Sequence, residues 1–389
     1  MLAIRAARLF DGVSAALVPR PMVLVEAGRI VAVRSGGEPP ADARLVDLGD
    51  VTLLPGLVDA HVHLVFDASA DPVGRLADAD DEAAFAGMRR AAATALAAGI
   101  TTVRDLGDRG YLGVRLRDEP ATHQGPRVLA AGPPITVSRG HCWFLGGEAD
   151  GVDGVRAAVR EHAERGVDVI KVMATGGELT PTTRPDEVSY GAAELRAAAS
   201  EAHRLGLPIT AHAHAVAGVR SVVEAGFDMV EHGTFMTAGG TTAEADDAVI
   251  EAILGAGVIV SATMGSVPGS PVPPRIAAIV PQLVAVFERL RAAGVPVICG
   301  SDGGIGPNKP HDVLPYSAEM MVNLDGYATQ EALRAVTSLA ADACGVGGRV
   351  GRAAPGYDAD LLAVAGDPLV DIAALRNVRA VFRAGERVR

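Results

Sequence analysis

The segment PGLVDAHVHL, residues 55–64, places two histidines at a spacing that suits metal binding. His61 and His63 lie near the end of an apolar run, and side chains two positions apart in a β-strand point to the same face. Both imidazoles can therefore reach one point. Imidazole nitrogen is a common zinc ligand, so a buried strand ending in His-x-His suggests a metal site. A pair that only forms hydrogen bonds inside a core is the alternative.

Four further apolar runs carry reactive side chains at or near their ends. They are VDVIKVM with Lys171, LPITAHAHA with His212 and His214, FDMVEHG with Glu231 and His232, and VPVICGSDGG with Ser301 and Asp302. In a barrel of parallel strands the carboxyl ends meet at one face, where the chemistry of such folds is found. We therefore expect these side chains to converge on one site.

Each of these residues also has a structural interpretation. A buried lysine usually pairs with a carboxylate or extends to solvent, and an aspartate after a strand usually caps a helix. The sequence GGIG after Asp302 is a poor helix start, which favours a functional role. Burial favours the neutral amine of Lys171, and a neutral amine can take up carbon dioxide to form a carbamate. Jointly the residues favour a reactive site over coincidental core contacts.

The middle of the chain alternates apolar runs with alanine-rich amphipathic segments. We expect strands at 54–61, 100–104, 127–131, 168–173, 208–212, 228–231, 257–261 and 296–300. Several intervening segments end in glycine, a common helix stop. Eight β units, most followed by a helix, predict an α/β fold of the (β/α)8 TIM-barrel type. An open doubly wound sheet is the competitor, which the lack of a G-x-G-x-x-G sequence after a strand weakens.

Both ends of the chain differ from the middle. Residues 1–52 contain short strands separated by glycine and proline, and EAGRIV predicts a hairpin around Gly28. The segments GRAAPGYDADLLAVAG and VRAVFRAGERVR near the other end have the same character. We therefore predict one small β-sandwich built from residues 1–52 and 346–389, and a barrel domain over residues 53–345.

The composition is that of a globular enzyme, with 49% hydrophobic and 21% charged residues. The net charge of −12 argues against a nucleic-acid surface. The N-terminus MLAIRAARLFDG lacks the apolar segment of a signal peptide, and no apolar run is long enough for a transmembrane helix. Cys142, Cys299 and Cys344 form no CxxC pair and suggest a reducing compartment. We expect a cytoplasmic protein with no membrane or nucleic-acid partner.

These motifs resemble those of the amidohydrolase superfamily over essentially the whole chain. The resemblance rests on PGLVDAHVHL, the lysine of VIKVMATGG, the histidines of AHAHA and VEHGTF, the aspartate of GSDGG and the tail GRAAPGYDADLLAV. TTVRDLG (101–107), GHCWFLGGEADG (140–151) and KVMATGG (171–177) are similar to the branch of imidazolonepropionase-like hydrolases and prolidases, or Xaa-Pro dipeptidases. The resemblance implies a metal-dependent hydrolase that acts on C–N bonds.

The resemblance also implies a binuclear metal site, most often holding zinc. Six side chains would supply the ligands: His61, His63 and Asp302 for the more buried metal, His212 and His232 for the second, and Lys171 between them. Carboxylated on its ε-nitrogen, Lys171 would bridge the ions together with a hydroxide that attacks an amide carbonyl. Asp302 would take up the proton of the attacking water, and His141 in GHCW would help to stabilise the oxyanion.

The branch resemblance implies a small-molecule substrate, a dipeptide or an N-acyl amino acid. Residues in or after the strands would contact it; our candidates are Arg104, Trp143, Tyr190, His214 and His311. His214 stands where relatives often carry tyrosine or another substrate-contacting group, and whether it meets substrate or metal stays open. Hydrolysis of a cyclic amide, carbamate or lactone is the alternative reaction, and a metal-free, non-catalytic scaffold is the alternative of another class. We also expect a homo-oligomer, which is frequent among such barrels.

Overall fold

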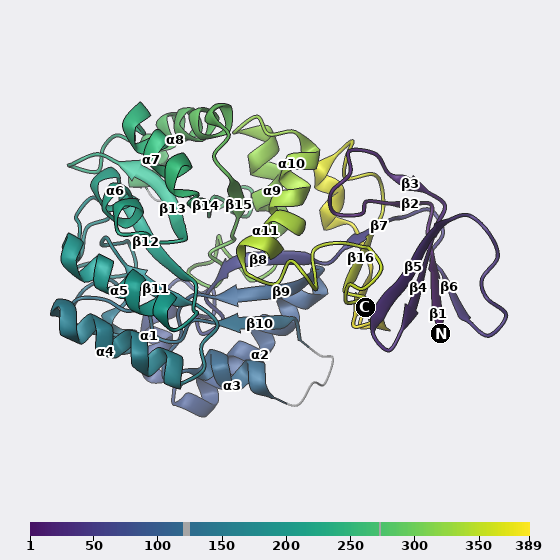
Figure 1. The fold of residues 1–389 in the computed structure, drawn as a ribbon, viewed down its shortest axis with the longest axis horizontal. Helices are drawn as coiled ribbons and strands as arrows, with labels where there is room; N and C mark the ends of the chain where they lie inside the picture. Colours follow the sequence, from purple (N-terminus) through teal and green to yellow (C-terminus); the bar gives the residue numbers. More distant parts are fainter. Residues whose placement is uncertain (120–124, 272–273) are drawn as a thin grey trace.

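The structure is a computed structural model that describes residues 1–119, 125–271 and 274–389. Within these ranges a barrel of parallel strands forms the centre of the molecule (Figure 1). Its strands are β8 (Leu57–Val62), β9 (Ile100–Asp105), β10 (Arg127–Ala130), β11 (Ile170–Met173), β12 (Ile209–Ala215), β13 (Met229–Met236), β14 (Ile259–Ala262) and β15 (Val297–Cys299).

Two backbone contacts close the barrel. The strands hydrogen-bond in two runs, β10-β9-β8 and β11 to β15. Ile135, just beyond β10, bridges to Val172 of β11, and Val62 at the end of β8 bridges to Gly303 beyond β15. The chain therefore has the predicted (β/α)8 architecture, which puts the carboxyl ends of all eight strands at one face.

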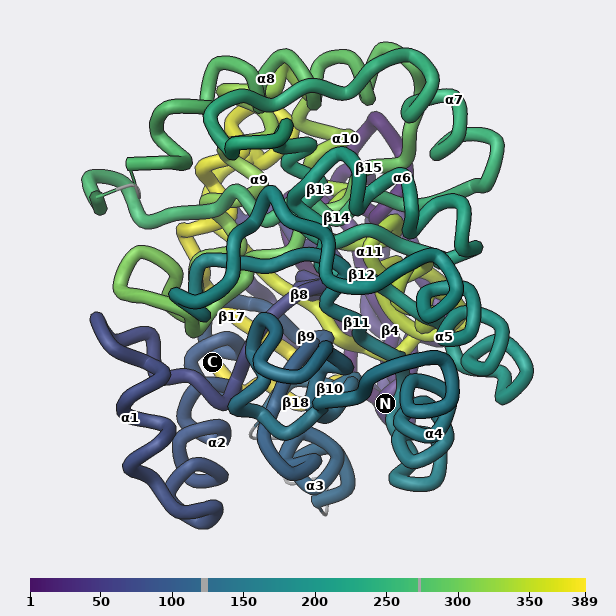
Figure 2. The backbone as a smooth tube through the Cα atoms, turned by 90° about the vertical axis from the view of Figure 1, so that its left-hand side faces the viewer, coloured from purple at the N-terminus to yellow at the C-terminus, as the bar shows by residue number. Residues whose placement is uncertain are grey.

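Helices surround the strands on the outside, as Figure 2 shows. They are α1 (Pro72–Asp78), α2 (Asp81–Ala97), α3 (Leu112–Asp118), α4 (Gly151–Glu164), α5 (Ala192–Arg204), α6 (Val216–Glu224), α7 (Asp247–Ala256), α8 (Pro274–Ala293), α9 (Leu314–Asn323), α10 (Thr329–Ala335) and α11 (Ser338–Ala343), with 3-10 turns η1 (Trp143–Leu145) and η2 (Ile372–Arg376). Sequence signals set several helix ends. Asp80 and Asp246 each cap the first turn of a helix, and Gly257 ends α7 in a left-handed conformation. Among the described residues, none of these helices is long and apolar enough to cross a bilayer.

The first barrel strand differs in one respect from the prediction. The single strand expected over 54–61 is two strands, β7 (Thr52–Pro55) and β8, which separate at Gly56. The amide of Gly56 donates to the carbonyl of Asp360 at 2.9 Å. A Cβ at Gly56 would lie only 2.1 Å from Thr101 Oγ1, so the close approach of β9 requires glycine there. The chain thus passes from one sheet to another at this residue.

Two smaller sheets from both ends of the chain stand beside the barrel (Figure 1). Their orders are β5-β4-β1-β6 and β18-β17-β16-β7-β2-β3. The strands are β1 (Leu2–Arg5), β2 (Arg8–Leu9), β3 (Val18–Pro19), β4 (Pro21–Glu26), β5 (Arg29–Ser35), β6 (Arg44–Asp47), β7, β16 (Leu361–Val364), β17 (Val378–Arg383) and β18 (Glu386–Arg387). Ile4 and Val23 of one sheet and Leu53 and Phe382 of the other share one buried cluster, so the sheets pack face to face.

The predicted hairpin at Gly28 is confirmed. Strands β4 and β5 pair in antiparallel register, with Glu26 opposite Arg29. The two residues between them, Ala27 and Gly28, both have positive φ, 48° and 78°. This is the conformation of a two-residue turn that matches the twist of its strands.

Candidate active site

Five histidines converge at the carboxyl face of the barrel. His61 and His63 come from β8 and the residue beyond it, His212 and His214 from β12, and His232 from β13. The ring centroids of neighbouring pairs lie 4.5 to 5.2 Å apart. Burial lowers the pKa of each ring, for example that of His63 to about 3 and that of His214 to about 4. The rings are therefore neutral at physiological pH, which is the form that binds metal ions.

Four of these rings each direct one nitrogen at a fixed oxygen of the protein. His61 Nδ1 lies 2.8 Å from Glu231 Oε2, and His63 Nδ1 lies 3.2 Å from the carbonyl of Gly107. The other two contacts are His212 Nε2 to the Gly176 carbonyl at 2.9 Å and His232 Nδ1 to Thr263 Oγ1 at 2.8 Å. The carboxylate and the two carbonyls can only accept, so they fix the tautomers of His61, His63 and His212 and leave the other nitrogen as the lone-pair donor. The hydroxyl of Thr263 orients the ring of His232.

The free donor atoms fall into two groups. One group comprises His61, His63 and Asp302, and the other comprises His212, His214 and His232. Within each group the ligand atoms lie within 4.8 Å of one another. Asp302 Oδ1 is 3.6 Å from His61 Nε2 and 3.5 Å from His63 Nε2. The first group is the set that the resemblance implies for the more buried metal.

The second group contains one residue more than the sequence assigned to it. His214, expected among the substrate contacts, lies with its ring stacked on that of His232 at 4.6 Å. Its Nδ1 is 3.0 Å from Thr234 Oγ1, so the ring is held by a threonine in the same way as that of His232. The geometry thus places His214 among the ligand candidates as well as at the wall of the cavity.

Lys171 sits in β11 beside these histidines. Its side chain is 1% exposed, and among the described residues its Nζ has no hydrogen-bond partner. Burial lowers the pKa of the amine to about 8. An orphaned buried amine is costly unless a ligand or a modification satisfies it. The neutral nitrogen donors and the carboxylate are a set of ligands that fits divalent metal ions.

Backbone strain accompanies two of the ligand candidates. His232 and Asp302 have φ of 69° and 57°, in the left-handed region that residues other than glycine rarely adopt. Asp302 is held there by its own amide, which donates to the carbonyl of His61 at 2.7 Å. Strain of this kind costs about 1–3 kcal/mol per residue and gathers at functional sites. Both side chains contact His61: the ring centroids of His232 and His61 lie 5.0 Å apart, and Asp302 Oδ1 lies 3.6 Å from His61 Nε2.

Sequence reasoning missed the part played by Glu231. This carboxylate is fully buried and accepts hydrogen bonds from Arg104 at 2.8 Å and Thr210 at 2.7 Å, besides its contact with His61. Burial alone would raise the pKa of Glu231, but Arg104 and His61 outweigh it and hold the pKa well below its usual range. Glu231 thus orients His61 as a permanent anion. The available signal was its position in the apolar run FDMVEHG, where a buried carboxylate needs partners.

His141 lies at the cavity, as expected. Its ring is 4.7 Å from that of His212 and packs against Gly177, where a Cβ would come within 2.4 Å of Nε2. Among the described residues Nδ1 has no partner. Burial, followed by the charge of His214, lowers the pKa of His141 to about 3. A neutral ring with an uncommitted nitrogen can serve as a hydrogen-bond donor to a substrate oxygen.

The structure does not place the other four expected substrate contacts at the cavity wall. Arg104 is 3% exposed and donates to Glu231 and to the carbonyl of Ala60, because its strand packs it into the barrel interior. Tyr190 is buried and donates to the carbonyl of Ala149 at 2.6 Å. His311 Nε2 lies 3.2 Å from the carbonyl of His63 and supports that ligand's backbone.

Trp143 is 39% exposed on η1, outside the cavity lining. These corrections share one cause. The sequence locates a residue on a strand or loop but not the direction in which its side chain points.

The cavity that the histidines open into has a volume of about 350 Å³. Most of its outer wall is apolar and comes from α8 and nearby loops, with Met264, Ile276, Leu283, Phe287 and Ile305. A second residue that sequence reasoning missed, Lys309, also lines it. Lys309 Nζ donates to the carbonyls of Thr263 and Ser301 at 2.5 and 2.9 Å. A half-buried ammonium with a third donor therefore interacts electrostatically with Asp302.

Comparison with known proteins decides the family. The sequence pattern of the family described as Amidohydrolase family matches residues 52–388. The chain belongs to the amidohydrolase family. The predicted resemblance is thereby confirmed, and this amidohydrolase is a hydrolase that acts on C–N bonds.

Three similar proteins illustrate the relationship. Ochratoxinase of Aspergillus niger is 27% identical to this amidohydrolase over 369 residues, covering 85% of this chain and 73% of its own. Imidazolonepropionase of Salinispora tropica is 28% identical over 371 residues, covering 87% and 84%. The crystal structure of a Xaa-Pro dipeptidase with methionine bound in the active site is 27% identical, covers 99% of both chains and has a TM-score of 0.84. The same architecture therefore spans the whole of this amidohydrolase.

Proposed function

We propose that this amidohydrolase uses two divalent metal ions, with zinc the expected metal, to cleave an amide bond. The observation that carries the proposal is the pairing of ring nitrogens. His61, His63, His212 and His232 each direct one nitrogen at a fixed oxygen and leave the other for a ligand. Rings inside an ordinary core would need partners for both nitrogens. His61, His63 and Asp302 would hold one ion, and His212 and His232, with His214 beside them, the other.

Lys171 would bridge the two ions as a carbamate. The unprotonated amine attacks carbon dioxide, a nitrogen–carbon bond forms, and one proton leaves to solvent. The product would carry one negative charge and two oxygens, so the modified Lys171 would offer the ions an anionic oxygen ligand. Burial of Nζ supports this step because it favours the unprotonated amine.

When bound, the ions would lower the pKa of a shared water, so that hydroxide is available near neutral pH. The protein's own groups would do the rest. The Lys309 ammonium helps to hold the pKa of Asp302 below its usual value against the effect of burial, so Asp302 is ionised and can take the proton of the attacking water. The same carboxyl group would return the proton to the leaving nitrogen. His141 would donate to the developing oxyanion.

The proposed substrate is a dipeptide or an N-acyl amino acid. The likeness to a Xaa-Pro dipeptidase with a bound amino acid supports this class. The apolar wall near α8 suits an uncharged side chain. Two of the three donors of Lys309 are committed to carbonyls, and the third would face a substrate carboxylate.

A panel of dipeptides and N-acyl amino acids tests the proposal. The zinc-loaded enzyme should release a free amino acid from members with an apolar side chain. If the metal-loaded protein releases nothing from the panel, the substrate class is wrong. Cyclic amides, carbamates and lactones would then be assayed, since the similarity to an imidazolonepropionase favours them as the second candidate. Protein that cannot be loaded with metal would instead support a non-catalytic scaffold.

A further inference from the structure

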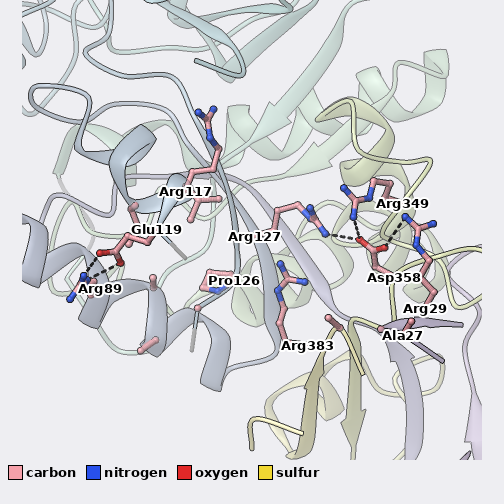
Figure 3. A pocket seen from close by; sticks show the side chains of 17 residues that line it. Ala27, Arg29, Arg89, Arg117, Glu119, Pro126, Arg127, Arg349, Asp358 and Arg383 are labelled. Atoms are coloured by element: carbon pink, nitrogen blue, oxygen red, sulfur yellow. Dashed lines mark hydrogen bonds and ion pairs between the residues drawn. The ribbon is translucent and has the colours of Figure 1, made fainter. Parts of the chain in front are cut away.

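A second and larger hollow lies where the small sheets meet the barrel. Its volume is about 830 Å³, and Figure 3 shows the arginines around it. Six arginines line it: Arg29, Arg89, Arg117, Arg127, Arg349 and Arg383. Arg127 is the first residue of β10, so the hollow lies at the amino end of the barrel strands, opposite the histidines. It is therefore separate from the candidate active site.

The two arginines that come from helices, Arg89 of α2 and Arg117 of α3, are neutralised by their own partners. Arg89 forms an ion pair with Glu119. Arg117 pairs with Asp118 and with Asp168, each at 2.8 Å. These groups need no further anion.

The other four arginines share too few acids. Asp358 alone accepts from three of them, with Arg127 at 2.6 Å, Arg349 at 2.9 Å and Arg29 at 3.7 Å (Figure 3). Arg383 pairs with Asp360 at 2.8 Å. We call these four arginines the arginine cluster.

Within the described residues, four guanidinium groups face the carboxylates of Asp358 and Asp360. Glu386 stands opposite Arg383 in the β17–β18 ladder and Glu26 opposite Arg29 in the hairpin, and both are exposed to solvent. Each guanidinium has five N–H donors, more than the two aspartates can accept from. Among the described residues, Arg127 Nε and Arg383 Nε are buried without a partner.

We propose that the arginine cluster binds the phosphate group of a small molecule. Guanidinium groups bind phosphate oxygens with two parallel hydrogen bonds, and arginine is the residue most used for this purpose. The phosphate oxygens would accept from N–H groups that the two aspartates leave unused. Leu116, Pro126 and Val128 form an apolar wall beside the arginines that an organic ester group could contact.

Binding would join three parts of the chain. Arg127 belongs to the barrel, Arg29 to the sheet of β5, and Arg349 and Arg383 to the C-terminal segment. A ligand that contacts all three in the folded protein stabilises it, by an amount that grows with the logarithm of its concentration above the Kd. The proposal is independent of the proposed reaction.

The test is thermal unfolding of the metal-loaded protein in inorganic phosphate, with sodium chloride at matched ionic strength as reference. At phosphate about 100-fold above its Kd the midpoint should rise by about 3 °C. Above the Kd the rise should grow with the logarithm of the phosphate concentration. It should fall by at least half in Arg349→Ala and in Arg29→Ala. Both side chains are about half exposed, so these variants should fold.

Arg289→Ala is the matched control, since Arg289 is also exposed and paired with one aspartate. It should keep the full response. Phenyl phosphate in place of inorganic phosphate distinguishes an ester from the free ion, and tighter binding of either identifies the source. A response that is equal in Arg349→Ala and wild type would place phosphate elsewhere, for instance at the metal ions, and overturn the proposal. So would a rise no larger than that in chloride.

Discussion

Two polar clusters lie at opposite ends of the barrel strands and satisfy their charges differently. In the arginine cluster the cations meet carboxylates of the same chain, as Arg127 meets Asp358 at 2.6 Å. At the histidine face the donor atoms meet one another instead. His61 Nε2 lies 3.3 Å from His63 Nε2, and Lys171 Nζ has no partner among the described residues.

The two ends of the barrel therefore differ in what their buried polar atoms need as partners. Lone pairs that face one another inside a protein repel, and a buried amine without a partner loses its hydration. The donor atoms of the histidine face therefore need ligands, whereas the arginines already meet carboxylates and only have N–H donors to spare. Substitutions at the first should impair function, and substitutions at the second should alter stability slightly.

Replacing Lys171 with alanine should have the largest effect. Without the bridging anion both bound metal and kcat/KM should fall together, the latter by about 10⁴-fold. Lys171→Arg keeps the positive charge but cannot form the carbamate, so it should lose as much. Metal analysis and steady-state assays check both variants. Wild-type activity in either one would remove the carbamate from the account.

Asp302→Asn should separate metal binding from turnover. The amide oxygen can still act as a ligand, but it cannot take up a proton, so kcat should fall by about 10³-fold while much of the metal stays bound. Asp312→Asn, an exposed carboxylate ten residues further on, is the control and should be unchanged. An Asp302→Asn enzyme that turns over normally would refute the proton transfer.

His141→Ala should slow the reaction without stopping it. A single oxyanion donor contributes about 2.7–4 kcal/mol, which corresponds to about 10²–10³-fold in kcat. KM and metal content should change little, because the histidine is not among the ligand groups. His203→Ala, on the exposed face of α5, serves as control. A large loss of metal would show that His141 is a ligand instead.

Glu231→Gln should weaken metal binding indirectly. Losing the anion that orients His61 should lower metal affinity about 10–100-fold. It also leaves the Arg104 guanidinium uncompensated in the core, which should cost about 3 kcal/mol of stability. Glu201→Gln is the matched control, because Glu201 is also paired with arginines but lies on α5. Equal metal affinity in wild type and Glu231→Gln would assign this residue to packing alone.

Arg349→Ala should have the smallest effect. In buffer without phosphate it should lower stability by less than about 1 kcal/mol and leave kcat unchanged, as for other exposed ion pairs. Chemical denaturation and the standard assay measure both. A larger loss would mean that the arginine cluster supports the fold in the way the metal ions are expected to support the other end.

Much of this arrangement could be predicted from the sequence. The barrel strands are apolar runs bounded by polar residues or glycine, so their positions agree with those expected to within a few residues. The ligand candidates could be found because His61, His63 and Asp302 stand at strand ends, where a buried strand gives way to the carboxyl face. Residue type and strand position together define such a site.

The features that could not be predicted depend on the direction in which side chains point and on contacts between distant segments. Strand β9 has the sequence ITTVRD, in which polar and apolar residues do not alternate, and all six residues are buried. This pattern does not indicate that Arg104 points into the barrel. Tyr190 lies in a loop whose path is set by distant contacts, such as its bond to Ala149. The arginine cluster joins Arg29 with Arg349, which lie far apart in the sequence. Only the folded chain brings these residues together.

The most direct test of the central claim is the metal content of the purified protein, measured by mass spectrometry of the elements after loading with zinc and removal of the excess. We expect two equivalents per chain, and less than one in Lys171→Ala. A wild-type protein that retains no metal after loading would contradict the account of the histidine face.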